Sequence, residues 1–317
     1  MYNIETLIIS PNFHGYGERI SLEMTKLGRK SVCLSFPQGS QYSLLSLYKI
    51  LLQILYNNIF FLLINLGYIK LDKVLIIRGD FLNQRQLKII QFRSSEMYLW
   101  LMDPVSRLHG LDLGPYKKVF SFDKRDCEVF KFTYLPLFSS FSRLKNEKEK
   151  KLKIKKILFI GSIYGDRLDK IINLSMELSD YEIVVWGGFS IFKIKDYYKT
   201  KKILSIYKNI KLRFGVVKLN KLLKLANSYS FVFNSVPEDQ FGLNMRFYEA
   251  VALNLTQISH NDDNLIKIFE VITSSYEPGR KSHTRISSSY SMLLTNVKDA
   301  QTANECAQFI LNDIVEN

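Results

Sequence analysis

A loop with a glycine follows the short apolar run at residues 157–160. Gly161 and Ser162 stand directly after that run, and Arg167 lies near the start of a helical pattern. A glycine lets the backbone come close to a bound phosphate, and the free N–H groups of a helix N-terminus attract an anion. Arginine adds a bidentate phosphate contact. The loop is neither a Walker loop nor a G-x-G-x-x-G fingerprint, so phosphate binding and a plain strand-to-helix turn both stay open.

A second loop of this kind contains Gly242, Leu243 and Asn244, which come just before another helical pattern. Arg246 and Glu249 follow within that pattern and are three residues apart, so they share a helix face. A carboxylate at this place could accept hydrogen bonds from both hydroxyls of a ribose. The alternative is a surface helix with an Arg–Glu pair.

A third loop contains Val216 and Val217, after the Phe214-Gly215 pair. A bent backbone there could present N–H and C=O groups to the edge of a nucleobase. A plain loop before a helix is the other interpretation.

The elements around these loops form two similar sets. Short apolar runs that alternate with helical patterns are typical of a parallel sheet with crossover helices. We expect strands at 6–10, 31–36, 73–78, 97–102 and 118–122, and then at 157–160, 182–186, 210–214, 230–234 and 255–259. The highly charged stretch 143–156 between the sets is typical of a solvated linker. The chain is therefore expected to be α/β, with two Rossmann-like domains.

The stretch 44–69 is very apolar, but Lys49, Gln53 and Asn57 interrupt it. These three polar residues are four apart, so they stack on one face of a helix. A crossover helix packed on the sheet is expected. An interfacial membrane helix is the second interpretation, and a membrane span, which needs about 20 nearly uninterrupted apolar residues, is the third.

Composition excludes several classes of protein. Of 317 residues, 47% are hydrophobic, which excludes wholesale disorder. The net charge of +14 favours anionic partners. The basic residues are dispersed without a nucleic-acid-binding motif, so no nucleic-acid partner is expected. Cysteine and histidine are scattered, which argues against disulfides and metal sites. The N-terminus has no basic leader before its apolar run, so we expect a cytoplasmic protein.

Four motifs occur in the order and spacing of one known family. They are FIGSIYGDR at 159–167, VVWGG at 184–188, FGVV at 214–217 and GLNMRFYEA at 242–250. In these motifs the chain resembles the CgeB-like glycosyltransferases, the spore-maturation-protein type of the group-1 glycosyltransferase superfamily. The match covers roughly residues 155–260, and the N-terminal half is similar more loosely, at WLMDP (100–104), KVFSFD (118–123) and YLPL (134–137).

The resemblance implies a GT-B fold, with two Rossmann-like domains facing across a cleft and a C-terminal helix crossing back to the first. It implies an acceptor-side domain at 1–150, a nucleotide-sugar-binding domain at 151–300 and the crossing helix at 301–317. A nucleotide-sugar donor is then the substrate. The motif positions place Glu249 at the donor ribose and Gly242, Leu243 and Asn244 at the helix start beside the diphosphate, with Arg246 in the same donor-binding motif. They place Gly161, Ser162 and Arg167 at the phosphates, and Val216 and Val217 at the base.

The expected reaction is sugar transfer to a glycan or lipid-linked acceptor, in synthesis of a bacterial surface polysaccharide such as lipopolysaccharide or capsule. Backbone N–H groups and arginine can stabilise a leaving diphosphate without metal, and no D-x-D motif occurs, so no cofactor or metal is expected. Retaining relatives place a second glutamate where this chain has Phe241. Glu238 lies slightly earlier and is a candidate for the donor sugar. Retention is favoured, with inversion left open.

An inverting enzyme needs a base from the N-terminal domain. His14 and Asp103 are the candidates we select, with Glu18 and Asp80 as further strand-end carboxylates. A nucleotide-sugar epimerase of the same fold and a non-catalytic nucleotide-sugar-binding scaffold are the alternative functions. The basic charge and the stretch 44–69 would also suit peripheral contact with the inner face of the cytoplasmic membrane.

Overall fold

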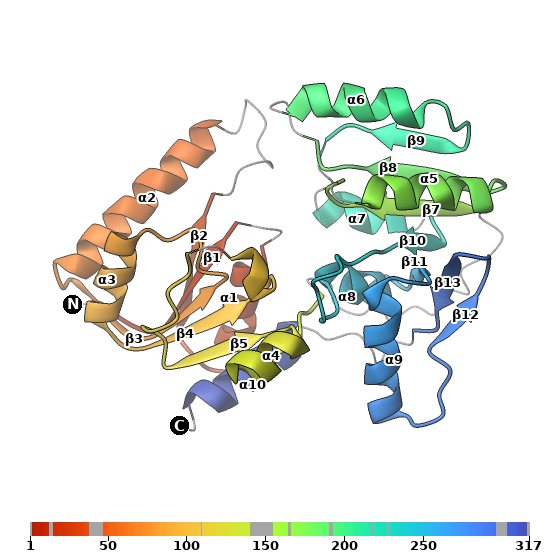
Figure 1. Cartoon of the computed structure of the whole chain (residues 1–317). Helices are drawn as coiled ribbons and strands as arrows, with labels where there is room; N and C mark the ends of the chain where they lie inside the picture. The colour runs from red at the N-terminus through yellow and green to blue at the C-terminus, as the bar shows by residue number, and fades with distance from the viewer. Residues whose placement is uncertain are drawn as a thin grey trace. The chain divides into compact units, whose positions relative to one another are not determined.

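The computed structural model describes residues 2–12, 15–37, 47–108, 110–139, 155–163, 166–189, 193–215, 217, 219–226, 228–295 and 303–315. The chain divides into two compact units (Figure 1). Unit 1 comprises Met1–Gly39, Leu44–Ser140 and Gln301–Asn317, and unit 2 comprises Ser40–Ser43 and Phe141–Ala300.

Unit 1 is built on a parallel sheet of six strands in the described residues, in the order β2-β1-β3-β4-β5-β6. The strands are β1 (Tyr2–Pro11), β2 (Ser31–Phe36), β3 (Ile69–Ile77), β4 (Ser94–Leu101), β5 (Lys118–Ser121) and β6 (Thr133–Tyr134). The helices are α1 (Tyr16–Lys26), α2 (Leu47–Asn65), α3 (Gln84–Arg93), the 3-10 helix η3 (Val105–Arg107), α4 (Lys124–Phe130) and α10 (Ala303–Val315).

Helices cover both faces of this sheet. On one face, Phe61 and Ile64 of α2 pack in the core with Leu7 and Ile9 of β1. On the other face, α10 packs against α1 (Figure 1). Central strands buried on both sides must be apolar almost throughout, which is why β1 appears in the sequence as a continuous run.

The C-terminal helix returns to unit 1, as the fold class predicted. The amide of Asn304 donates to Glu23 of α1 at 3.4 Å, and Lys118 of β5 pairs with Asp313 at 2.6 Å. Ile310 is fully buried. Residues more than 170 positions after β6 therefore complete the core of unit 1.

Unit 2 has a sheet of seven strands in the described residues, in the order β12-β13-β11-β10-β7-β8-β9. The strands are β7 (Lys156–Ile160), β8 (Glu182–Trp186), β9 (Ile210–Arg213), β10 (Phe231–Phe233), β11 (Thr256–His260), β12 (His283–Arg285) and β13 (Tyr290–Leu293). The helices are α5 (Arg167–Glu177), α6 (Ile194–Leu204), α7 (Leu219–Ala226), α8 (Met245–Ala252) and α9 (Asn264–Tyr276).

The strands from β11 to β9 in this order are parallel, and α5 and α6 pack on one face of the sheet while α7 and α8 pack on the other. The strands β12 and β13 add an antiparallel edge. The sequence pattern did not predict these strands, because they are only three and four residues long and β12 is polar. The predicted α/β class with two Rossmann-like domains is confirmed.

Helix α2 packs on the sheet with two polar side chains on its inner side. Gln53 and Asn57 point inward and donate to the Ser35 carbonyl of β2, at 3.2 and 3.0 Å, whereas Lys49 is exposed. The helix does pack on the sheet through Phe60, Phe61 and Ile64. By length and composition alone, it is the one helix in the described part of the chain that is long and apolar enough to cross a membrane, over Tyr48–Asn65.

Unit 2 contains an acid-sensitive contact between α5 and the β12–β13 turn. Partial burial raises the pKa of Glu177, but hydrogen bonds from the hydroxyls of Ser287, Ser288 and Ser289 and from the Ser289 N–H outweigh it and hold the pKa at about 2. The Ser288 hydroxyl and the Ser289 N–H lie 2.9 and 3.0 Å from Glu177 Oε2. The folded state therefore favours the ionised carboxylate.

A lowered carboxyl pKa gives stability that is present above the unfolded pKa of 4.5 and is lost as the pH falls towards about 2. We expect Glu177→Gln to flatten the dependence of the urea unfolding midpoint on pH between these limits. Glu270→Gln, at an exposed position of α9, is the matched control and should leave that dependence unchanged. An equally steep pH dependence in the Glu177 variant would contradict the assignment.

Candidate functional site

The carboxyl ends of the parallel strands in unit 2 place two loops together. Arg167, the first residue of α5, donates to the Ser162 carbonyl after β7 and to the Ser235 carbonyl after β10, both at 3.0 Å. Gly161 donates its N–H to the Trp186 carbonyl at 3.1 Å, so the β7 loop is also tied to β8. Arg167 thus joins two strand-end loops, a role that the sequence did not indicate.

The loop after β10 is fixed by a buried carboxylate that the sequence did not single out as functional. Asp263, the N-cap of α9, accepts from the N–H groups of Val236 and Leu265 at 3.2 and 3.0 Å. Its other oxygen accepts from the Ser235 hydroxyl at 2.5 Å and contacts the Lys170 ammonium at 3.3 Å. An aspartate before an apolar helical run was the available signal, and it indicates only a cap.

The start of α8 is held by a network of three amides. Asn244 is the N-cap, and its side-chain oxygen accepts from the Phe247 N–H at 2.9 Å. Asn234, at the end of β10, exchanges hydrogen bonds with Asn244 at 2.8 and 3.1 Å and donates to Gln257 of β11 at 2.9 Å. Gly242 and Leu243 before the cap are buried. The N-terminus of α8 is therefore held by hydrogen bonds to residues of β11 and of the segment directly after β10.

Arg246 and Glu249 form an ion pair on the first two turns of α8. The Glu249 side chain is only 3% exposed and that of Arg246 is 20% exposed, so this is a nearly buried pair rather than the surface pair considered from the sequence. The Arg246 Nε is buried and makes no hydrogen bond in the described residues. A buried, incompletely satisfied guanidinium beside a buried carboxylate is unusual in a purely structural helix.

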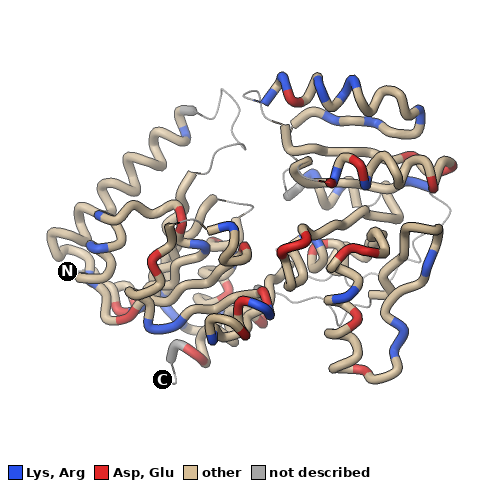
Figure 2. Tube along the Cα trace, viewed as in Figure 1, with Lys and Arg blue, Asp and Glu red and all other residues tan. Residues whose placement is uncertain are grey.

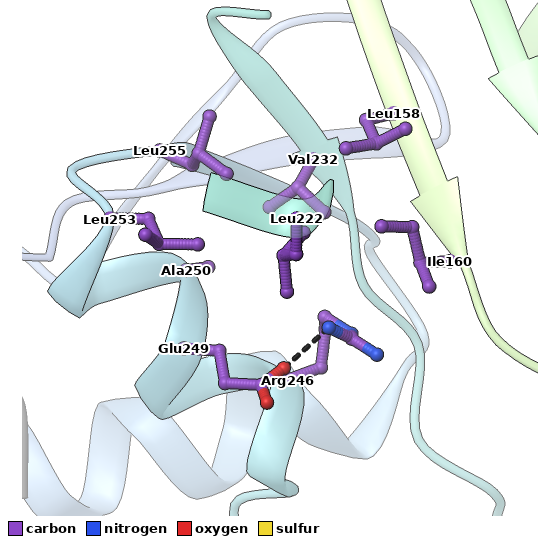
Figure 3. A pocket seen from close by; sticks show the side chains of 9 residues that line it. All are labelled: Leu158, Ile160, Leu222, Val232, Arg246, Glu249, Ala250, Leu253 and Leu255. Carbon is purple, nitrogen blue, oxygen red and sulfur yellow. Dashed lines mark hydrogen bonds and ion pairs between the residues drawn. The ribbon is translucent and has the colours of Figure 1, made fainter. Parts of the chain in front are cut away.

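The pair closes one end of a small apolar pocket (Figure 3). Its other lining side chains are all aliphatic and come from β7, α7, β10, α8 and the turn after α8: Leu158, Ile160, Leu222, Val232, Ala250, Leu253 and Leu255. Apolar walls lower the local dielectric constant and strengthen any hydrogen bond that the Glu249 carboxylate makes.

The position expected to hold a base contributes a core side chain. Val217 is buried in the cluster that contains Leu158 and Leu222. Only its backbone is therefore available to a ligand. Val216 and His14 lie outside the described residues. Near Val217, the Lys221 ammonium lies 4.0 Å from the centre of the Trp186 ring at the end of β8.

Two candidates of unit 1, Asp80 and Asp103, lie after β3 and β4, and Glu18 lies on α1. The Arg78 Nε forms ion pairs with two carboxylates. It lies 3.4 Å from Asp103 Oδ2 and 2.9 Å from Asp80 Oδ1. Burial raises the pKa of Asp103 and the charge of Arg78 opposes that effect. Glu18 accepts instead from the Ser35 hydroxyl. Asp103 and Asp80 therefore share one arginine at the carboxyl edge of the sheet, and Glu18 has a different partner.

Glu238 lies in the loop after β10, and its side chain is exposed. Its carbonyl accepts from the Asn264 amide at 2.7 Å, which anchors the loop to α9. No cluster of three or more His, Cys, Asp or Glu side chains that could hold a metal is found in the ranges that the structure describes.

No protein-family model matches the chain, and no curated protein sequence is similar to it. A solved structure is similar in fold: UDP-GlcNAc 2-epimerase from Methanocaldococcus jannaschii, in complex with UDP-GlcNAc and UDP. The two share 11% sequence identity with a TM-score of 0.53, over 99% of this chain and 100% of that chain. This likeness, with the two parallel-sheet units, shows a GT-B-like two-domain fold.

Proposed function

We propose that the chain is a glycosyltransferase that binds a nucleotide-sugar donor on unit 2. The observation that carries the proposal is the buried Glu249 on α8, which lies about one turn after the fixed N-terminus of that helix and lines a pocket with Ile160, the residue before Gly161. In this assignment Glu249 accepts from the ribose hydroxyls. Gly161 and the N-terminus of α8 bind the diphosphate, and the backbone of Val217 contacts the base.

The proposed chemistry is departure of a nucleoside diphosphate from the anomeric carbon while an acceptor hydroxyl attacks that carbon. Negative charge then develops on the diphosphate, and the N–H groups at the α8 N-terminus stabilise it without rearrangement because the amide network already fixes them. Arg167 acts in our assignment as a positioning residue, since it holds the loops after β7 and β10 together.

Retention is favoured, and for the inverting reaction that is left open the proposed acceptor of the hydroxyl proton is Asp103 of unit 1. Burial raises the pKa of its carboxyl group, which makes the carboxylate a stronger base, and Arg78 keeps it oriented. His14 remains a second candidate. We further propose a glycan or lipid-linked acceptor in surface polysaccharide synthesis. The proposed reaction is metal-independent and the proposed location is cytoplasmic. The proposed membership of the CgeB-like family rests on the four sequence motifs.

Nucleotide-sugar 2-epimerisation is the second candidate function. It is favoured by the fold of the solved neighbour, which was crystallised with UDP-GlcNAc and UDP. The two functions differ in one requirement, since an epimerase converts its nucleotide-sugar without an acceptor. A non-catalytic scaffold would bind the nucleotide-sugar and convert it under neither condition.

The test begins with a calorimetric screen of the full chain against UDP, GDP, CDP, CMP, dTDP and their sugars. A true ligand at about 100 times its Kd should raise the free energy of unfolding by about 2.7 kcal/mol. The nucleotide-sugar that binds is then incubated with and without a glycan or lipid-linked acceptor. Turnover only with acceptor supports transfer, and a new sugar epimer without acceptor supports epimerisation. A folded chain that binds none of these compounds would refute the donor site.

Gly161→Ala separates phosphate binding from folding. A Cβ at this position would meet Phe159 at 3.6 Å and Arg167 at 3.9 Å, which are ordinary contacts, so the thermal unfolding temperature should stay within about 2 °C of the wild type. The added methyl group would stand where the diphosphate approaches the backbone, and we expect about tenfold weaker nucleotide affinity. Unchanged affinity by calorimetry would remove Gly161 from the site.

A further inference from the structure

Helix α2 presents an apolar stripe to solvent. Its outward residues recur every three or four positions and therefore share one helix face. They are between 48 and 69% exposed: Tyr48, Leu51, Leu55, Ile59 and Leu62. An ordinary surface helix has the opposite arrangement, with apolar residues inside and polar residues outside.

The orientation of α2 is fixed from its inner side. Gln53 and Asn57 lie on the opposite face and both donate to the Ser35 carbonyl, and Gln53 also donates to Asn57 at 3.0 Å. Turning the helix to bury the stripe would break these bonds and expose Phe61 and Ile64. The stripe is thus an outward surface of the folded unit.

Basic residues of α3 lie beside the C-terminal end of α2. Helix α3 packs against α2 (Figure 1), and neither helix contains an acidic residue. An open hollow at their junction is lined by Asn65, Gln84, Arg85, Lys88, Ile89 and Phe92. Arg85 and Lys88 are exposed, and Phe92 is 80% exposed. In Figure 2 the tube of α2 is uncharged except at Lys49, and the charged positions of α3 are basic.

We propose that this surface, the α2 stripe with Arg85, Lys88 and Phe92, binds the surface of a bilayer that contains anionic phospholipids. The aliphatic and aromatic side chains would enter the interfacial region, and the two cations would contact lipid phosphates. The bonds of Gln53 and Asn57 to β2 keep the helix part of unit 1, so the contact is peripheral and not a span. Charge complementarity favours an anionic bilayer over a second copy of this basic chain. The proposal does not rest on the nucleotide-sugar site.

The test is flotation of the full chain with vesicles. Binding to vesicles with about a third phosphatidylglycerol should exceed binding to pure phosphatidylcholine by at least about tenfold and should weaken in high salt. Leu55→Glu with Leu62→Glu should reduce binding by at least about tenfold. Val271→Glu, at a position of α9 that is 60% exposed, is the matched control and should bind as the wild type does.

A second pair of variants tests the charges. Arg85→Glu with Lys88→Glu should lose most binding to the anionic vesicles. Lys195→Glu with Lys199→Glu on α6 changes the net charge equally at exposed positions and should retain it. Equal losses from the two pairs, or full binding by the Leu55 and Leu62 variant, would overturn the proposal.

Two further measurements show whether each variant is folded and whether the chain forms dimers. Circular dichroism and a cooperative urea unfolding transition without vesicles show that a variant is folded, and Leu55→Ser with Leu62→Ser replaces the glutamate variant if that one unfolds. A wild-type chain that ignores anionic vesicles and forms dimers that the Leu55 variant disrupts, as seen by analytical ultracentrifugation, would overturn the proposal in favour of a second copy.

Discussion

Glu249→Gln should weaken the affinity for the nucleoside diphosphate by at least about 100-fold, because two charge-assisted hydrogen bonds to ribose are lost. The same change removes the negative partner of Arg246, whose guanidinium is largely buried. We therefore also expect the free energy of unfolding to fall by about 3 kcal/mol. Isothermal titration calorimetry and urea unfolding measure the two effects separately.

Two companion variants separate binding from stability. Arg246→Met with Glu249→Met replaces the ion pair by apolar side chains beside an aliphatic pocket, so stability should recover while binding does not. Arg246→Lys keeps a cation beside Glu249 and should retain affinity within about threefold. Wild-type affinity in the double Met variant would show that Glu249 is only structural.

Asp263→Ala should lower the free energy of unfolding by about 3 kcal/mol, the second largest effect that we expect. The change removes the cap of α9, leaves the Val236 N–H and the Ser235 hydroxyl without their acceptor, and takes one carboxylate from Lys170. Since Ser235 also accepts from Arg167, the β10 loop would lose its position, and nucleotide affinity should fall with stability.

The adjacent aspartate is the natural control for that experiment. The Asp262 side chain is 93% exposed, so Asp262→Ala should change the free energy of unfolding by less than about 0.5 kcal/mol. Urea unfolding of both variants gives the comparison. Equal effects at the two positions would contradict the assigned role of Asp263 in holding the β10 loop.

The sequence was sufficient to predict the parallel strands of the described residues except β6, because a strand buried on both faces is a continuous apolar run such as 157–160. The spacing of Arg246 and Glu249 likewise predicted a shared helix face, and the ion pair forms. Both predictions depend on local periodicity, which a single chain contains in full.

What the sequence could not show depends on distant partners. The bond from Arg167 to Ser235 joins residues 68 positions apart, and that from Asp263 to Ser235 spans 28. The periodicity of Gln53 and Asn57 placed them on one face of α2, but the carbonyl that makes this the inner face belongs to Ser35. Polar edge strands such as β12 lack the apolar pattern by which strands are recognised.

The return of α10 to α1 makes unit 1 discontinuous along the chain. During synthesis, all of unit 2 is made before the helix that covers α1. The first 139 residues therefore keep part of their apolar surface exposed to solvent while unit 2 is synthesised and folds. Unit 1 should complete its folding only after translation has passed residue 315. A chaperone that recognises exposed apolar surface would then bind unit 1 rather than unit 2.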